Sequence, residues 1–288
     1  MQAASAEATT RENDTNLVLH DDQREPVVRI MPRLLLLVTL TFAFTACTPT
    51  AFGWQEGLPR ELIAYRQSFE DAAGSELLDS ITRRDLLAQM ERSKLLWLGD
   101  HHRHSRLHAL QTELLEQLQQ RGVQMAFGLE AIGVRDERLV NDFLANRIDL
   151  NTLREQVRTR WDGSWLDDRD LDPWFYRSLL EFAKRHRIPV FALEPTPRLE
   201  LKMRDTYIAQ TIQNACERYQ DKLIVVLLGQ THLLGKGDVV GRSGRRGTVL
   251  GGLPTERLLS QSPSVLARGD FWRTDQNVYW FGEMFRGN

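Results

Sequence analysis

Two histidine motifs of the form Gly-x-x-His are the residues of this sequence best suited to do chemistry. The first is 99–102 (Gly-Asp-His-His) and the second is 229–232 (Gly-Gln-Thr-His), and each follows an apolar run typical of a buried strand. Open α/β folds bind their ligands at the carboxyl ends of such strands. Two imidazoles delivered there, His102 and His232, could hold a metal ion, bind haem iron or shuttle protons.

The first motif lies in a segment rich in histidine. Four of the seven histidines fall within it: His101, His102, His104 and His108. His104 and His108 are four residues apart, so they share a face if a helix has begun there. For either of them, a solvated or helix-capping role is the simpler interpretation. His102 is the best ligand candidate of the group because it follows a strand and a glycine.

Two glutamates end apolar runs in the same way. Glu130 ends the run 126–130, and Glu194 ends the run 190–194. A carboxylate at a strand end can bind a metal, or act as a general base whose pKa burial has raised. The alternative is a helix cap or turn, which Pro195 favours for Glu194.

The pair Arg204-Asp205 lies within a helical pattern before the second motif. It is either a surface ion pair of little energetic value or a pair that points at the strand ends and orients a histidine.

The spacing of apolar residues predicts strands alternating with helices. We expect strands over 94–99, 123–130, 188–194 and 223–229, and helices over 61–73, 80–93, 105–120, 136–146, 151–160, 173–186 and 197–219. This order predicts an α/β fold with a mainly parallel central sheet, helices on both faces and a ligand cleft at the strand carboxyl ends. Residues 241–252, rich in Gly and Arg, are expected to form a flexible loop, and 265–281 to contain two strand-like runs.

The N-terminal part has the pattern of a lipoprotein signal peptide. Residues 1–30 are polar and patternless, and we interpret them as an upstream extension without function. Residues 31–46 combine a short basic start, an apolar run too short for a membrane span of about 20 residues, and a small residue before Cys47. Cys47 is therefore the expected lipidation site. Residues 47–59 would be an anchor and tether, and 60–288 a single α/β domain.

Composition excludes several classes of protein. The formal net charge is −2, and no basic region argues for nucleic-acid binding. Cys216 is the single cysteine besides Cys47, so the fold is expected to stand without disulfides.

The motifs resemble those of the ChaN-like haem-binding lipoproteins. Gly99-x-x-His102 with His108 and Gln111 is similar to the family pattern Gly-Glu-x-His-Asp-Asn-Pro-x-His-His-x-Leu-Gln. Glu130 falls where the family has a strand-terminal Glu. Arg204-Asp205 resembles the Arg-Asp helix motif of the wider superfamily, which includes Tiki metalloproteases, TraB proteins and erythromycin esterases. The second histidine motif is similar to Gly-x-Gly-His, the last motif of the superfamily in sequence. Together these motifs span about residues 90–240.

The sequence departs from the family pattern at two places. Asp100 stands where the family has Glu, which shortens the carboxylate by one methylene. Arg103-His104-Ser105 replaces Asp-Asn-Pro and adds a histidine.

The resemblance implies a lipoprotein anchored in the bacterial cell envelope, on the periplasmic side of the outer membrane, that binds haem or an iron ligand and serves iron uptake. The candidate ligands are His102, His232, Glu130, His101, His104 and His108, with Arg204 and Asp205 behind them. The alternative is a metal-dependent hydrolase of esterase or peptidase type, with Fe, Mn or Zn as its ion and with Asp100, Glu130 or Glu194 in catalysis. A third alternative is a scaffold without turnover. A small-molecule ligand, a membrane contact through the anchor and a homodimer are the expected partners.

Overall fold

The computed structural model describes residues 60–73, 79–158, 165–168, 171–252, 271–275 and 277–282, all within one compact unit, Ala51–Asn288. The predicted segments 1–30, 31–46 and 47–59, and with them Cys47, lie outside the described residues. Within the described part, every helix is too short or too polar to cross a membrane.

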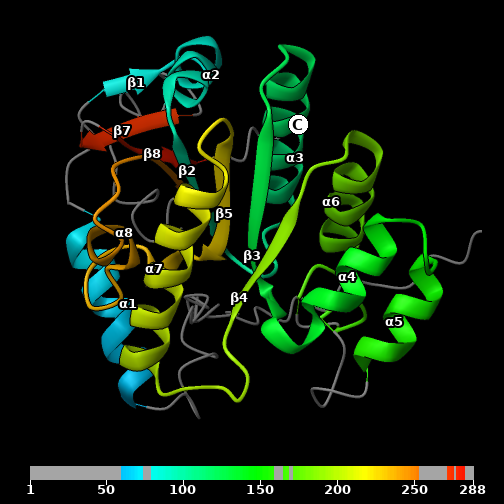
Figure 1. Ribbon diagram of the computed structural model, residues 1–288. Coiled ribbons are helices and arrows are strands. Elements are labelled where there is room, and N and C mark those ends of the chain that lie inside the picture. Colours follow the sequence, from blue (N-terminus) through cyan, green and yellow to red (C-terminus); the bar gives the residue numbers. More distant parts are fainter. Residues whose placement is uncertain are drawn as a thin grey trace, which may run out of the picture. The chain divides into compact units, whose positions relative to one another are not determined.

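The core of the described fold is an eight-stranded mixed sheet (Figure 1). Its order is β1-β7-β8-β6-β2-β5-β3-β4. The strands are β1 Asp79–Ile81, β2 Leu95–Asp100, β3 Met125–Gly133, β4 Val190–Glu194, β5 Leu223–Gly229, β6 Thr248–Gly252, β7 Phe271–Asp275 and β8 Val278–Phe281. β8, β6, β2, β5, β3 and β4 run parallel, while β7 is antiparallel to both β1 and β8. The predicted α/β fold with a mainly parallel sheet is therefore confirmed.

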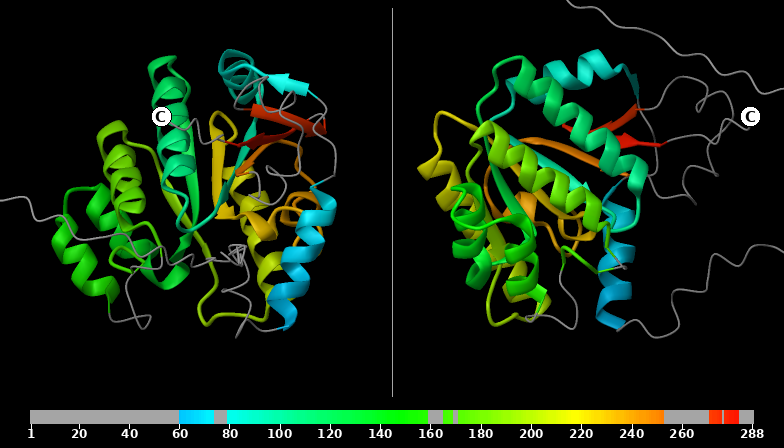
Figure 2. Two further views of the ribbon diagram at one scale, coloured as in Figure 1. Left: turned by 180° about the vertical axis from the view of Figure 1, so that it is seen from behind. Right: turned by 90° about the vertical axis from the view of Figure 1, so that its right-hand side faces the viewer.

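The central strands are apolar on both faces because helices cover both faces (Figure 2). In β5, Val225 and Leu227 belong to the larger buried cluster, while Ile224 and Val226 belong to the second cluster on the opposite face. The larger cluster is completed by α2, α3 and α6, and the second by α7. The helices are α1 Arg60–Ala72, α2 Arg83–Arg92, α3 Ser105–Gln120, α4 Glu137–Leu144, α5 Leu150–Arg158, α6 Pro173–His186, α7 Leu201–Arg218 and α8 Val239–Arg242, with 3-10 turns η1 Val134–Asp136 and η2 Gln230–His232.

The prediction of a flexible loop over 241–252 was wrong. β6 lies inside the sheet, parallel to β2 on one side and β8 on the other, and its residues are buried. The glycines of β6 made the segment look like a loop in the sequence. At Gly251 an added Cβ would come within 2.8 Å of the Trp280 ring. Glycine occurs inside this strand because the Trp280 ring approaches the backbone closely. The sequence pattern of the strand could not reveal that contact.

The expected helix over 80–93 was also wrong at its start. Residues 79–81 form the short edge strand β1, and Thr82 then caps α2 by accepting a hydrogen bond from the Asp85 amide. A three-residue strand carries too little alternation to be recognised from sequence.

Candidate functional site

The predicted site residues come from four neighbouring parallel strands. Asp100 ends β2 and lies opposite Gly229 at the end of β5. Glu130 lies in β3, which pairs with β5, and Glu194 ends β4, which pairs with β3. The two histidine motifs therefore meet at one edge of the sheet, the carboxyl edge.

The glycines of the two motifs are needed for space. Neither Gly99 nor Gly229 has a positive φ. A Cβ on Gly99 would lie 2.8 Å from the Cβ of Gln230, and one on Gly229 would lie 3.2 Å from Glu130 Oε2. Each motif glycine thus lets a functional segment from another strand pack against the backbone.

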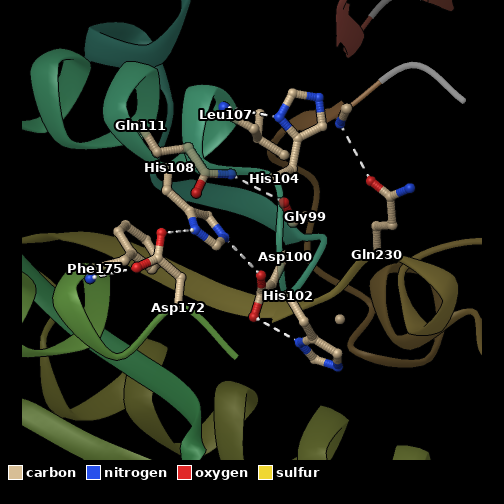
Figure 3. Close-up of polar contacts among 12 residues, drawn as sticks. Gly99, Asp100, His102, His104, Leu107, His108, Gln111, Asp172, Phe175 and Gln230 are labelled. Carbon is tan, nitrogen blue, oxygen red and sulfur yellow. Dashed lines mark hydrogen bonds and ion pairs between the residues drawn. The ribbon is translucent and has the colours of Figure 1, made fainter. Parts of the chain in front are cut away.

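Asp100 is the centre of the first polar cluster (Figure 3). Its side chain is buried, and Oδ1 lies 2.9 Å from His108 Nε2. Oδ2 accepts a hydrogen bond from the Tyr176 hydroxyl and lies 3.2 Å from His102 Nδ1. Burial by itself raises the pKa of Asp100, but the hydrogen bonds from His102 and His108 outweigh it and hold that pKa below its usual range. Asp100 is therefore an ionised carboxylate that orients the groups around it.

His108 lies between two carboxylates. Its Nδ1 is 3.0 Å from Asp172 Oδ2, opposite the contact of its Nε2 with Asp100, and the Phe175 ring stacks on it at 4.1 Å. Two carboxylate acceptors require both ring nitrogens to carry protons. Although burial lowers the pKa of His108, the hydrogen bonds to Asp100 and Asp172 outweigh burial and raise it. His108 is thus a buried imidazolium that stabilises Asp100.

We expect His108→Gln to lower the free energy of unfolding most at acidic pH. A histidine whose pKa is raised in the folded state contributes stability that is complete below the unfolded pKa of about 6.5 and is lost as pH rises through the folded value. The difference from wild type should therefore be larger at about pH 6 than at about pH 9 in urea unfolding. His186→Gln, which removes an exposed histidine of α6, is the matched control. A difference that grows with pH would contradict a buried imidazolium.

His102 is the histidine of the first motif that points outward. Its side chain is 57% exposed, while its Nδ1 faces the buried Asp100 carboxylate. That hydrogen bond raises the pKa of His102 against the lowering effect of burial. A carboxylate on one ring nitrogen fixes the orientation of the ring and makes the other nitrogen a better ligand. His102 Nε2 is therefore the imidazole nitrogen of this cluster that is placed to receive a ligand.

The remaining histidines of the segment have other placements. His104 is the N-cap of α3, where its Nδ1 accepts a hydrogen bond from the Leu107 amide at 3.1 Å. His101 is exposed and contacts the His104 ring edge-on, with the centroids 6.0 Å apart. The capping alternative is thus the one observed for His104, while His108 is neither a cap nor solvated. Whether either binds a ligand stays a prediction.

Arg204 is the centre of a second cluster, at the ends of β3, β4 and β5. It is 2% exposed, so the surface alternative does not hold. Its Nε donates to Glu194 Oε2 at 2.6 Å, and a terminal nitrogen donates to Glu130. Its other terminal nitrogen lies 3.0 Å from His232 Nε2. One guanidinium therefore contacts both strand-terminal glutamates and the histidine of the second motif.

The two glutamates respond differently to this arginine. Burial alone would raise the pKa of Glu130, but Arg204 and the Gly229 amide at 2.5 Å lower it to about 2. At Glu194 the effect of burial exceeds that of Arg204, and the pKa is raised. Glu130 is the ionised partner of Arg204, and Glu194 is the carboxylate of this cluster that takes up a proton more readily.

The contacts of His232 assign its tautomer. An arginine N–H can only donate, so Nε2 of His232 accepts, and the proton lies on Nδ1. Nδ1 faces Asp205 Oδ1 at 2.7 Å, and Asp205 is fully buried. Both ring nitrogens of His232 thus have protein partners, which distinguishes it from His102.

The donor set around Arg204 does not fit a divalent ion. The atoms that could bind a metal on Glu130, Glu194 and His232 instead accept hydrogen bonds from the guanidinium. The guanidinium carries the positive charge that a metal would bring. Among the residues described, no group of three or more His, Cys, Asp or Glu side chains is arranged to hold a metal. The arrangement suits a fixed internal cation.

Three contributing residues were missed by the sequence analysis. Asp172 and Tyr176 bring α6 against the Asp100 cluster. Tyr65 of α1 lies beside His232, with the ring centroids 5.9 Å apart, and burial and the nearby Asp205 raise the pKa of Tyr65 to about 12. Asp172 before Pro173 carried a helix N-cap signal, which the structure shows. Nothing in the sequence linked it, Tyr176 or Tyr65 to the histidines.

The fold and the site define an α/β protein with histidine–carboxylate clusters at the carboxyl edge of a parallel sheet. Residues 86–203 match the sequence model of the family described as "Haem-binding uptake, Tiki superfamily, ChaN". Over this segment the chain is similar to that family, which confirms the predicted resemblance. Arg204, Asp205 and His232 lie beyond the matched residues.

Solved structures show distant similarity. The cofacial haem complex of ChaN from Campylobacter jejuni is 9% identical, with a TM-score of 0.40, over 61% of this chain and 88% of that one. The type III effector HopBA1 is 15% identical, with a TM-score of 0.47, over 68% and 90%. The C-terminal region of Pasteurella multocida toxin is 12% identical, with a TM-score of 0.42, over 68% and 28%. No curated protein matches the sequence.

Proposed function

We propose that this protein binds haem at the carboxyl edge of its sheet, with His102 Nε2 as the ligand to iron. The observation that carries the proposal is the exposed His102 imidazole, whose Nδ1 is held by the buried, ionised Asp100. Haem iron is commonly held by one histidine whose other ring nitrogen is hydrogen-bonded to the protein. The ChaN-like family match over 86–203 supports the same ligand.

The residues around His102 fit this role. His108 and Tyr176 both contact Asp100 and keep it in place behind the His102 ring. Haem, when bound, would supply the iron, and His102 would supply the nitrogen that holds it. His232 is a weaker candidate because Arg204 and Asp205 occupy its two ring nitrogens. Its role is to help hold the strand ends together.

Titration of the purified protein with haemin tests the proposal. We expect a saturable Soret band whose position is that of histidine-ligated haem. The metal-hydrolase alternative is tested by elemental analysis after anaerobic purification. A stoichiometric divalent metal together with no specific haemin absorbance would overturn the haem proposal in favour of that alternative.

We expect Asp100→Asn to weaken haemin binding roughly 10–100-fold, the usual cost of losing the hydrogen-bonded partner of a ligand. The amide keeps the shape of the side chain but removes the charge that holds His102. Asp172→Asn is the matched control: Asp172 also contacts His108, but it does not contact His102. Equal losses for the two variants, measured by haemin titration, would show that Asp100 acts through the general stability of the cluster.

We further propose that the protein is anchored in the cell envelope through lipidated Cys47 and serves iron uptake from there. The signal-peptide pattern of residues 31–46 supports this anchor. We expect Cys47→Ser to abolish incorporation of a fatty-acid analogue and to release the protein from the membrane fraction. Cys216→Ser, at a half-buried position within α7, is the control and should label like wild type. Full labelling of Cys47→Ser would rule out this lipidation site.

A further inference from the structure

The large apolar side chains that stay exposed lie on elements that border the carboxyl edge of the sheet. Among the described residues they are Leu62, Ile63, Val134, Trp174 and Met203, and Trp174 is the most exposed at 72%. Single exposed apolar residues are ordinary on protein surfaces. Five of them along one edge of a sheet are less ordinary. We call these five residues the apolar edge.

Topology places three of them at the carboxyl edge of the sheet. Val134 directly follows β3. Trp174 and Met203 lie in the first turns of α6 and α7, and each of these helices leads into the start of the next parallel strand, so its first turn lies at the carboxyl ends (Figure 1).

Leu62 and Ile63 belong to the first turn of α1. This helix packs on η2, with Tyr65 beside His232, so α1 also borders the strand ends that carry the candidate site.

The same border is rich in positive charge. The exposed lysines and arginines along it outnumber the exposed carboxylates; the cations are Arg60, Arg103, Arg106, Arg135, Arg198 and Lys202, and the carboxylates are Glu61 and Glu200. The guanidinium of Arg177 also lies 5.1 Å from the centre of the Trp174 ring. Apolar side chains, an aromatic ring among them, bordered by Lys and Arg are the composition of a surface that lies on anionic lipid.

The proposed anchor lies only a short distance before this edge in sequence. Cys47 precedes Arg60, the first residue of α1, by 13 positions. At most about 3.3–3.6 Å per residue, such a segment spans no more than roughly 45 Å even when fully extended. A lipid at Cys47 would therefore keep the start of α1, and the apolar residues on it, within that distance of the bilayer.

We propose that the apolar edge is a membrane-docking face that lies on an anionic lipid surface. This inference rests on the proposed lipid anchor, and it goes beyond it, because an anchor alone would leave the domain free to turn. Docking through this edge would direct the strand ends that carry His102 toward the lipid surface. Haem would then enter or leave the protein at the membrane.

The test uses the full lipidated chain with Cys216→Ala and one environment-sensitive NBD label at a time. Labels are placed on the apolar edge through Ile63→Cys or Met203→Cys. The control label is placed through Gln120→Cys, at the last residue of α3, an exposed position at the opposite edge of the sheet. The protein is reconstituted on vesicles of equal parts phosphatidylcholine and phosphatidylglycerol. Co-flotation with the vesicles measures whether the lipid anchor attaches the protein to the membrane. The emission wavelength of the label and its quenching by brominated lipid measure whether the labelled face contacts the lipid.

We expect both apolar-edge labels to shift to shorter wavelength and to be quenched by brominated lipid, while the label at 120 does neither. Trp174→Glu should reduce the shift at 203, and Gln120→Glu should not. A chain that floats with vesicles while its labels stay unchanged would overturn the docking face but not the anchor. A chain that does not float would overturn both. An emission shift that occurs without vesicles and grows with protein concentration would show that a second copy of the chain covers this face. That result would also contradict the proposal. Haemin titration of the same protein in detergent tests the proposed haem site independently of membrane docking.

Discussion

Replacing Arg204 by alanine should lower the free energy of unfolding by about 3–5 kcal/mol, the usual cost of removing one partner from a buried ion pair. Arg204 is the partner of Glu130 and Glu194, and it also donates to His232. Without it, the ionised, half-buried Glu130 would keep the Gly229 amide but lose its cation. Urea unfolding followed by circular dichroism measures the change.

Three further variants test this expectation. Arg83→Ala removes an arginine from an exposed ion pair with Glu113 and should cost under about 1 kcal/mol. Adding Glu130→Gln to Arg204→Ala should recover part of the loss, because the carboxylate left behind would no longer be charged. Arg204→Lys should fall between wild type and the alanine variant, since an ammonium cannot reproduce the geometry of the planar fork. Similar losses for Arg83→Ala and Arg204→Ala would mean that the buried cluster does not hold the strand ends together.

Replacing His102 by alanine should abolish the histidine-ligated Soret band and weaken haemin binding by at least about 100-fold, the upper end of the loss for an altered ligand environment. The ring is mostly exposed, so the variant should fold normally and lose function rather than structure. Haemin titration and urea unfolding of the same preparation separate the two effects.

His101→Ala is the matched control, because it removes an adjacent, exposed histidine of the same motif. It should bind haemin like wild type. His232→Ala should show the opposite pattern to His102→Ala: a loss of stability, since Arg204 and Asp205 would lose their shared partner, with histidine ligation retained. Ligation that survives His102→Ala and disappears with His232→Ala or His104→Ala would assign the iron to another histidine.

The sequence by itself determined the central part of the fold. The helices predicted over 105–120 and 173–186 have the same ends in the structure, and the predicted strand 223–229 is β5. Strong apolar periodicity and local capping residues specify such elements, because neighbouring residues decide them. The order of strands and helices also placed His102, Glu130, Glu194 and His232 at one edge, since parallel strands in such a sheet end on the same side.

Only the tertiary structure decided what each of these residues contacts. Asp172 meets His108 and Tyr176 meets Asp100 across separations of 64 and 76 residues in sequence, and no local pattern encodes such contacts. Arg204-Asp205 has the composition of a surface pair, yet it is buried because α7 turns this face toward the strand ends. β6 was hidden for the same reason, because its glycines are explained only by the Trp280 ring that approaches them from β8. Periodicity specifies which side of an element is apolar, whereas long-range packing decides which buried charges meet, and so which of the two motif histidines is left exposed for a ligand.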